Sequence, residues 1–190
     1  MTVLACPRTD ADMNFDLLID LHQNNYRQGP GSDEHTLLAM TIARLQDRQD
    51  RLTIADIGCG TGSQTLVLAK HLNADIYAVD VFPEFLSVLE KKAKDSDLKS
   101  TIHSKPCSMD DLDFAPESLD VVWSEGALYN MGFGQAIAYL QPFLNKGGLM
   151  ACSEVTWLTQ ERPKVLEDHW QAEYAEMGDA GDKIQVLSQH

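Results

Sequence analysis

The sequence has little positive charge. Its 15 Lys and Arg residues stand against 29 Asp and Glu residues, which gives a net charge of −14 and a pI near 4.6. Such a surface repels phosphate backbones. The densest basic cluster is Lys91, Lys92 and Lys94, and it lies beside acidic residues on a predicted helix. We therefore expect no nucleic-acid substrate.

Long apolar runs and grouped metal ligands are also lacking. No run approaches the ~20 residues of a membrane span, and the N-terminus lacks a signal-peptide pattern. Four cysteines, Cys6, Cys59, Cys107 and Cys152, are scattered without metal spacing, and the six histidines are dispersed. This scatter of cysteines and histidines indicates reduced thiols in a cytoplasmic protein and no bound metal.

What the sequence does contain is a strand, a glycine turn and a helix between Leu52 and about Leu72. The stretch LTIADIGCGTGS begins with branched apolar residues typical of a buried strand. Three glycines follow at alternate positions: Gly58, Gly60 and Gly62. Glycines allow a sharp turn and close approach of a ligand, and the N–H groups at the start of the helix face that ligand. An ordinary turn needs one glycine, so three of them favour a nucleotide-binding loop.

The spacing of the acidic residues narrows the class of ligand that the loop could bind. Asp56 ends the first strand, and Asp80 ends the next apolar run, 80 − 62 = 18 residues after Gly62. A carboxylate about 20 residues beyond such a loop typically binds ribose hydroxyls. The alternative for Asp80 is a cap for the helix that begins at Pro83. The dinucleotide pattern G-x-G-x-x-G is broken, because Ser63 stands where its last glycine belongs.

DIGCGTG, followed by a strand ending in VD, resembles motifs I and II of the class I S-adenosylmethionine-dependent methyltransferases. RQGPGS, SMDDL and WSEGALYN add a similarity to small-molecule enzymes related to quinone biosynthesis. The resemblance covers about Met13 to Met177. It implies S-adenosylmethionine as cofactor, a small-molecule substrate, and a cofactor shell of ten residues: Asp56, Gly58, Cys59, Gly60, Gly62, Asp80, Phe82, Met109, Asp110 and Ser124.

Three of these residues are expected to surround the adenine. Phe82 would stack on the ring, although it could also form a hydrophobic staple with its helix. The resemblance places Met109 and Asp110 after the third strand, Met109 packing on the ring and Asp110 accepting from the exocyclic amine. For Asp110, a solvated acidic loop is the alternative.

Catalytic and substrate-binding candidates come from the ends of later strands and from the N-terminal helices. Because ligands collect at the carboxyl ends of parallel strands, we expect Asp56, Asp80, Asp110 and Glu125 to converge there. Glu125 is the first candidate for a general base and Tyr129 the second. Glu125 could instead cap a turn or bind the cofactor's ammonium group, and Tyr129 could be a core aromatic. The substrate candidates are Tyr26, Gln28, Asn130 and Trp157.

Strands alternate with helices five times, which predicts an α/β fold with a doubly wound, mostly parallel sheet. We expect one domain over residues 1–190: N-terminal helices at 13–50, a cofactor-binding core at 51–154, and a C-terminal helix and short tail at 155–190. The helix from Ser32 to about Gln49 should bury Leu38, Ile42 and Leu45.

The sequence is short after the fifth predicted strand. Enzymes of this type usually add two more strands, whereas residues 178–190 have no alternating apolar run, and Lys183 to His190 resembles the start of a helix. We therefore expect five strands, with the fifth uncovered and open to self-association. Two alternatives to methyl transfer remain: a cofactor-binding module made inactive by the missing strands, and a nicotinamide-dependent reductase, which Ser63 argues against.

Overall fold

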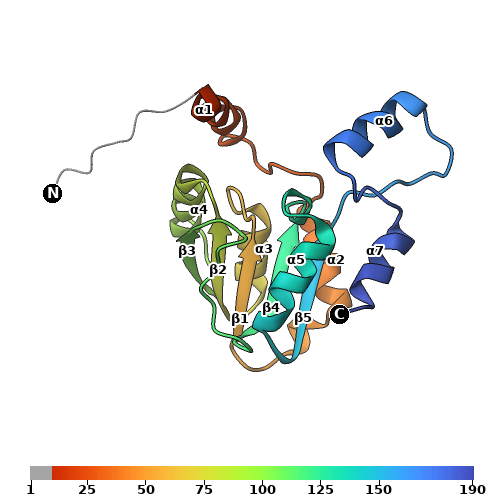
Figure 1. The fold of residues 1–190 in the computed structure, drawn as a ribbon. Coiled ribbons are helices and arrows are strands. Elements are labelled where there is room, and N and C mark those ends of the chain that lie inside the picture. Colours follow the sequence, from red (N-terminus) through yellow and green to blue (C-terminus); the bar gives the residue numbers. More distant parts are fainter. Residues whose placement is uncertain (1–9) are drawn as a thin grey trace.

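The computed structural model describes residues 10–190, with side chains from residue 15 onward (Figure 1). Cys6 lies outside the described residues. The helices are α1 (Asp10–His22), α2 (Asp33–Ile42), α3 (Ser63–His71), α4 (Pro83–Lys94), α5 (Phe133–Leu140), α6 (Lys164–Glu173) and α7 (Ala180–Leu187). The strands are β1 (Leu52–Ile57), β2 (Ala74–Asp80), β3 (Thr101–Pro106), β4 (Leu119–Glu125) and β5 (Leu144–Ser153). Short 3-10 turns are η1 (Leu45–Asp47), η2 (Leu128–Asn130) and η3 (Gln141–Phe143).

The five strands form one parallel sheet in the order β3-β2-β1-β4-β5. The order reverses between β1 and β4, so a crevice is expected at their carboxyl ends. The predicted doubly wound sheet is confirmed, with β3 and β5 at its two edges. The described tail also forms the predicted helix, α7.

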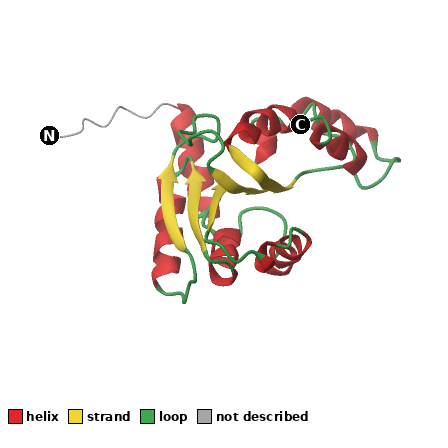
Figure 2. Ribbon diagram, turned by 90° about the horizontal axis from the view of Figure 1, so that it is seen from below, coloured by secondary structure: helices red, strands yellow, loops and turns green. Residues whose placement is uncertain are grey.

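Helices cover both faces of the sheet (Figure 2). On one face, α2 and α3 pack on Ile54, Ile76 and Trp123, and α4 continues this layer over Ala78. On the other face, α5 packs on Ile57 and Val122. Successive residues of β1 therefore point to opposite layers, as the pleat of a strand requires.

The inward face of α2 differs from the prediction. Thr36 and Met40 are buried, whereas Leu38 and Ile42 are 55% and 75% exposed. Residues four apart share one helix face, so a stripe through Thr36 and Met40 turns Leu38 and Ile42 outward. The helix also ends at Ile42, because Arg44 adopts a left-handed conformation with φ 54°. Leu45 is buried as predicted, but from η1.

Two later helices are shorter than their sequence predicts. The sequence predicts a helix over 133–144, but α5 ends at Leu140, and η3, which contains Pro142, leads directly into β5. It also predicts a helix from about Pro163 to Met177, but α6 ends at Glu173, since Tyr174 takes up an extended conformation and enters the core. This departure from the helix places Tyr174 beside α5.

Candidate functional site

The glycine loop between β1 and α3 is built around left-handed backbone. Gly58, Gly60 and Gly62 have φ of 69°, 56° and 82°, values that favour glycine. A Cβ on Gly62 would overlap Leu89, lying 2.8 Å from its Cγ. Gly62 also precedes α3 directly, so the first N–H groups of that helix, which have no intrahelical partners, lie beside the loop.

Asp80 ties this loop to the end of β2. Its carboxylate accepts hydrogen bonds from the backbone N–H of Gly60 at 2.8 Å and of Phe82 at 2.9 Å. Burial raises the pKa of Asp80, and these backbone donors oppose the rise. The carboxylate therefore lies at the carboxyl edge of the sheet, next to the loop, as a ribose-binding group requires.

The segment after α1 lies on the same loop. The Gln28 side chain donates to Thr61 Oγ1 at 2.7 Å and accepts from the Thr61 backbone N–H at 3.1 Å. The Ser63 hydroxyl donates to the Tyr26 carbonyl. Tyr26 and Gln28, both predicted substrate residues, are thus adjacent to the loop. Tyr26 itself is 67% exposed, and its hydroxyl donates to Asp33.

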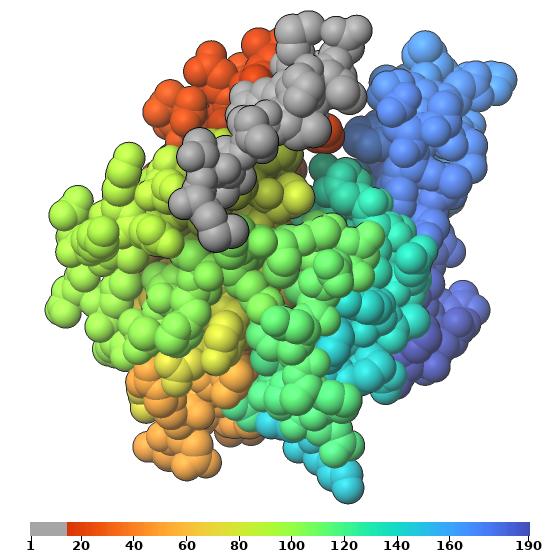
Figure 3. Space-filling model, turned by 60° about the vertical axis from the view of Figure 1, so that its left-hand side comes forward, coloured from red at the N-terminus to blue at the C-terminus, as the bar shows by residue number. Residues whose placement is uncertain are grey.

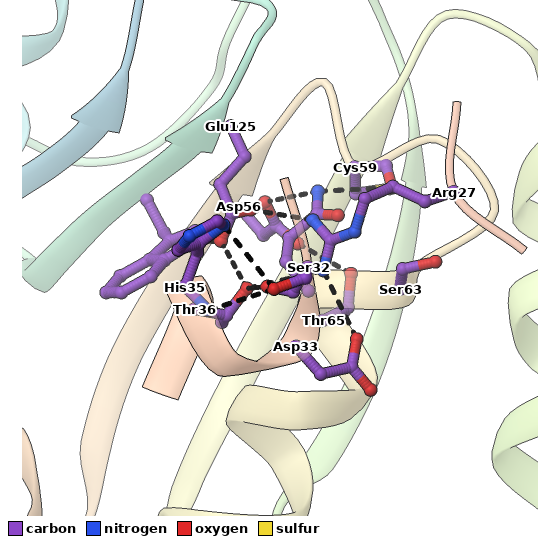
Figure 4. Close-up of polar contacts among 12 residues, drawn as sticks. Arg27, Ser32, Asp33, His35, Thr36, Asp56, Cys59, Ser63, Thr65 and Glu125 are labelled. Carbon is purple, nitrogen blue, oxygen red and sulfur yellow. Dashed lines mark hydrogen bonds and ion pairs between the residues drawn. The ribbon is translucent and has the colours of Figure 1, made fainter. Parts of the chain in front are cut away.

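Arg27 forms a largely buried ion pair with Glu125 (Figure 4). Its Nη1 lies 2.7 Å from Glu125 Oε2, and the two side chains are only 10% and 11% exposed. Arg27 Nη2 also contacts Asp33 and Thr36, each at 3.3 Å. This network fastens the N-terminal segment to the end of β4.

The arrangement argues against the predicted general-base role of Glu125. Its second oxygen, Oε1, accepts hydrogen bonds from Thr36 Oγ1 at 2.7 Å and from Trp123 Nε1 at 3.0 Å. Both oxygens are therefore engaged by protein donors. We assign Glu125 a positioning role, closer to the alternative in which it stabilises local structure.

Asp56 is fully buried beneath the loop. It accepts hydrogen bonds from Thr65 Oγ1 at 2.5 Å and Gln64 Nε2 at 3.3 Å, both on the first turn of α3. Burial is the main cause that raises the pKa of Asp56 to about 7, and the charges of Glu125 and Asp80 add to the rise. In this structure the Asp56 side chain holds α3 against β1, and its predicted contact with the cofactor stays a prediction.

This burial predicts a pH-dependent contribution to stability. Between pH 4 and about 7, folded Asp56 retains a proton that the unfolded chain has lost, so the stability it contributes falls as pH rises through this range. The expected loss is up to about 1.4 kcal/mol per pH unit. Urea unfolding of the protein and of Asp56→Asn at pH 5, 6, 7 and 8 measures it. The free energy of unfolding of the unaltered protein, relative to that of Asp56→Asn, should fall as pH rises to about 7 and then level off. Parallel pH profiles of the two proteins would contradict the assignment.

The remaining predicted cofactor residues divide into buried and accessible ones. Cys59 and Ser124 are buried, and the Ser124 hydroxyl donates to the Ile57 carbonyl, so their side chains support the loop from within. Met109 lies 3.6 Å from the position of a Cβ on Gly58. Phe82 is part-buried between Phe85 and Phe15 of α1, and Asp110 is exposed.

The residues predicted for the acceptor lie on the β4 side of the same end. Tyr129 is 40% exposed and contacts the Tyr174 ring edge-on, with centroids 6.1 Å apart. Asn130 is exposed and donates to the Ala127 carbonyl. Trp157 is part-buried beneath the Arg162 guanidinium, 4.5 Å from its ring centroid. In the space-filling view, the red-orange atoms of the described N-terminal segment and the blue atoms of α6 both lie at this end of the molecule, at the top (Figure 3).

Arg27, Thr36 and a buried lysine, Lys183, were not among the predicted site residues. For Arg27 a signal was available, because it is the one charged residue in the segment RQGPGS.

Among residues 10–190, no helix combines the length and the apolar character that crossing a membrane requires.

Comparisons with known proteins agree with this geometry. A family described as "Methyltransferase domain" matches residues 54–148, half of the 190 residues. The Rhodobacter capsulatus magnesium-protoporphyrin O-methyltransferase is 33% identical over 66 residues, 35% of this chain and 29% of that protein. The probable S-adenosylmethionine-dependent methyltransferase CRG1 of Saccharomyces cerevisiae is 28% identical over 102 residues, 53% and 35% of the two chains. The chain spans about a quarter to a third of the length of the curated relatives that it matches.

Solved structures share the fold at low sequence identity. YjhP of E. coli aligns with a TM-score of 0.74 and 16% identity, over 91% of this chain and 70% of that one. A Haemonchus contortus phosphoethanolamine N-methyltransferase, solved with phosphomonomethylethanolamine and S-adenosylhomocysteine, aligns with a TM-score of 0.69 and 18% identity. That alignment covers 95% of this chain and 41% of the other. The family match, the parallel sheet and the glycine loop together place this chain among the class I S-adenosylmethionine-dependent methyltransferases.

Proposed function

We propose that the protein binds S-adenosylmethionine at the glycine loop and catalyses methyl transfer to a small-molecule acceptor. The observation that carries the proposal is the pairing of the loop with Asp80, which bonds the loop backbone from the end of β2. A turn of three left-handed glycines at a helix start, with a carboxylate on the adjacent strand, suits an adenosine-containing ligand.

The residues at the loop fit the parts of this cofactor. The Asp80 carboxylate has lone pairs beyond its two backbone bonds and would accept from ribose hydroxyls. Met109, next to Gly58, and Phe82, next to Asp80, offer apolar surface for adenine. When bound, the cofactor supplies a methyl group on a sulfonium, which an acceptor nucleophile attacks in line.

The chain's own contribution is mainly positioning. Correct orientation of two reactants can lower a barrier by up to ~7–11 kcal/mol. The Arg27–Glu125 pair fixes the N-terminal segment on the loop, and Tyr129 lies exposed on the acceptor side. Tyr129 is the remaining candidate for a group that contacts the acceptor. A similarity to quinone-biosynthesis enzymes, like self-association through the β5 edge, stays a prediction.

Calorimetric titration with S-adenosylhomocysteine tests the proposal. Asp80→Asn should weaken binding roughly tenfold to a hundredfold, the effect of losing a charged hydrogen-bond acceptor. Asp75→Asn is the matched control, because Asp75 lies at the amino end of the same strand, paired with Arg51. Equal affinity of Asp80→Asn and the unaltered protein would refute ribose binding by Asp80, and no binding to any form would refute the cofactor.

A further inference from the structure

A second group of buried charged side chains lies between α5 and α7, on the face of the sheet opposite Arg27 and Glu125. Glu154 follows the carboxyl end of β5, Tyr174 follows α6, and Lys183 lies on α7. The methyl-transfer site described above uses none of them. The Lys183 side chain is only 8% exposed. A lysine is rarely so buried unless its ammonium is paired.

The Lys183 ammonium is enclosed by the groups that recognise alkylammonium ions. It donates to the Tyr174 hydroxyl at 2.7 Å and to the Glu176 carbonyl at 2.8 Å. It also lies 4.6 Å from the ring centroid of Tyr174 and 4.9 Å from that of Phe133. The Phe133 ring and two oxygen acceptors, one of them the Tyr174 hydroxyl, thus surround one nitrogen and form an aromatic cage of the kind that holds ammonium ligands.

Glu154 is the acidic partner of this group. Its side chain is 5% exposed, and it lies 3.8 Å from the Lys183 nitrogen. Burial raises the pKa of Glu154, and the nearby Tyr174 hydroxyl, Lys183 and the Val155 backbone N–H oppose the rise. Among the described residues, none of these donors makes a hydrogen bond of good geometry to either carboxylate oxygen. A buried carboxylate without such a bond is costly, and a cation that approached it more closely would remove that cost.

We propose that Phe133, Glu154 and Tyr174 form a binding site for an alkylammonium group, which Lys183 fills in this structure and for which the methyl acceptor competes. The site lies at the same end of the sheet as the proposed cofactor loop, since Glu154 follows β5 and Tyr174 contacts Tyr129. The ammonium is a recognition group on the acceptor. Binding displaces the Lys183 side chain, and with it the anchor of α7.

The acceptor role rests on the proposed function, whereas the ammonium site does not. A lysine that served only to anchor α7 would not give way to a free amine in the unaltered protein. The two views therefore differ in whether butylammonium displaces the Lys183 side chain, and Lys183→Ala shows first whether the emptied site accepts an ammonium ion.

Lys183→Ala titrated with n-butylammonium chloride, an alkylammonium one carbon longer than the removed group, is the first test. We expect the melting temperature to rise saturably, by roughly 3–6 °C at about ten times the dissociation constant. Equal concentrations of sodium chloride and of n-butanol control for ionic strength and for apolar binding. Lys183→Ala/Glu154→Gln should lose the response, because the carboxylate is gone. No saturable rise, or an equal rise in the double variant, would overturn the proposal.

Hydrogen exchange on the unaltered protein keeps the proposal testable if Lys183→Ala does not fold. Butylammonium in excess should increase exchange over residues 180–187 in a saturable way, with n-butanol having no such effect. Unchanged exchange would overturn the site. Binding of S-adenosylhomocysteine is measured separately, so failure of the cofactor proposal and failure of the ammonium site give different results.

Discussion

Arg27→Ala is expected to lower the free energy of unfolding by about 3–5 kcal/mol, a large share of the stability of a single domain. The substitution leaves the Glu125 carboxylate without its guanidinium partner in a place where its side chain is only 11% exposed. Breaking one half of a buried ion pair costs far more than the net value of the pair. Urea unfolding followed by Trp fluorescence measures the loss, as a lower midpoint at an unchanged slope.

Two further variants separate the effect of burying the ion pair from the effect of losing a charge. Arg44→Ala removes an ion pair with Asp47 whose partners are 81% and 61% exposed, so its expected cost is about 0–1 kcal/mol. Arg27→Ala/Glu125→Gln removes the stranded charge and should recover part of the loss. A cost for Arg27→Ala no larger than that of Arg44→Ala would show that the pair does not secure the N-terminal segment.

Gly62→Ala is expected to destabilise the fold by about 2–5 kcal/mol and to abolish measurable cofactor binding. The left-handed backbone costs a side chain about 1–2 kcal/mol, and insertion into a packed core costs about 1–3 kcal/mol more. The inserted methyl would overlap Leu89, which is fully buried on α4. Relief of that overlap must shift the loop or α4, and both lie beside Asp80.

Gly147→Ala is a closely matched control for Gly62→Ala. Gly147 has the same φ of 82°, but a Cβ there meets nothing within 4 Å. It should therefore show the conformational cost of about 1–2 kcal/mol alone and leave cofactor affinity unchanged. If Gly62→Ala were no more destabilising than Gly147→Ala, the packing of Leu89 against the loop would not restrict this position.

The parts of the fold that the sequence predicts are those with local signals. The apolar run ending at Asp56, the left-handed glycines and the helix after them are neighbours in the chain, so spacing alone identifies them. The same holds for Pro83, which begins α4 as expected. Parallel pairing of β1 with β2 then follows from the helix between them.

The parts that sequence reasoning missed depend on distant partners. Arg27 and Glu125 are 98 residues apart, so the pattern around Glu125 showed a free carboxylate where the fold supplies a guanidinium. Asp56 was correctly placed at a strand end, but the inward direction of its side chain follows from the packing of Thr65 onto it. Its predicted role as a cofactor contact stays a prediction.

The C-terminal residues illustrate the same limit. The tail was expected to begin a helix, and α7 does so from Asp179, whose side chain caps it. Nothing in its polar sequence indicates that Lys183 is buried, because the carboxylate and the rings around it come from the end of β5, from α5 and from the residue that leaves α6.

The structure of the protein with S-adenosylhomocysteine tests the central claim most directly. We predict the ribose hydroxyls within hydrogen-bonding distance of the Asp80 carboxylate, the adenine against Met109 and Phe82, and the loop 58–62 beside the ligand with its glycines still left-handed. Density for the ligand at any place away from Asp80 and this loop, at a concentration that saturates the calorimetric titration, would contradict the account.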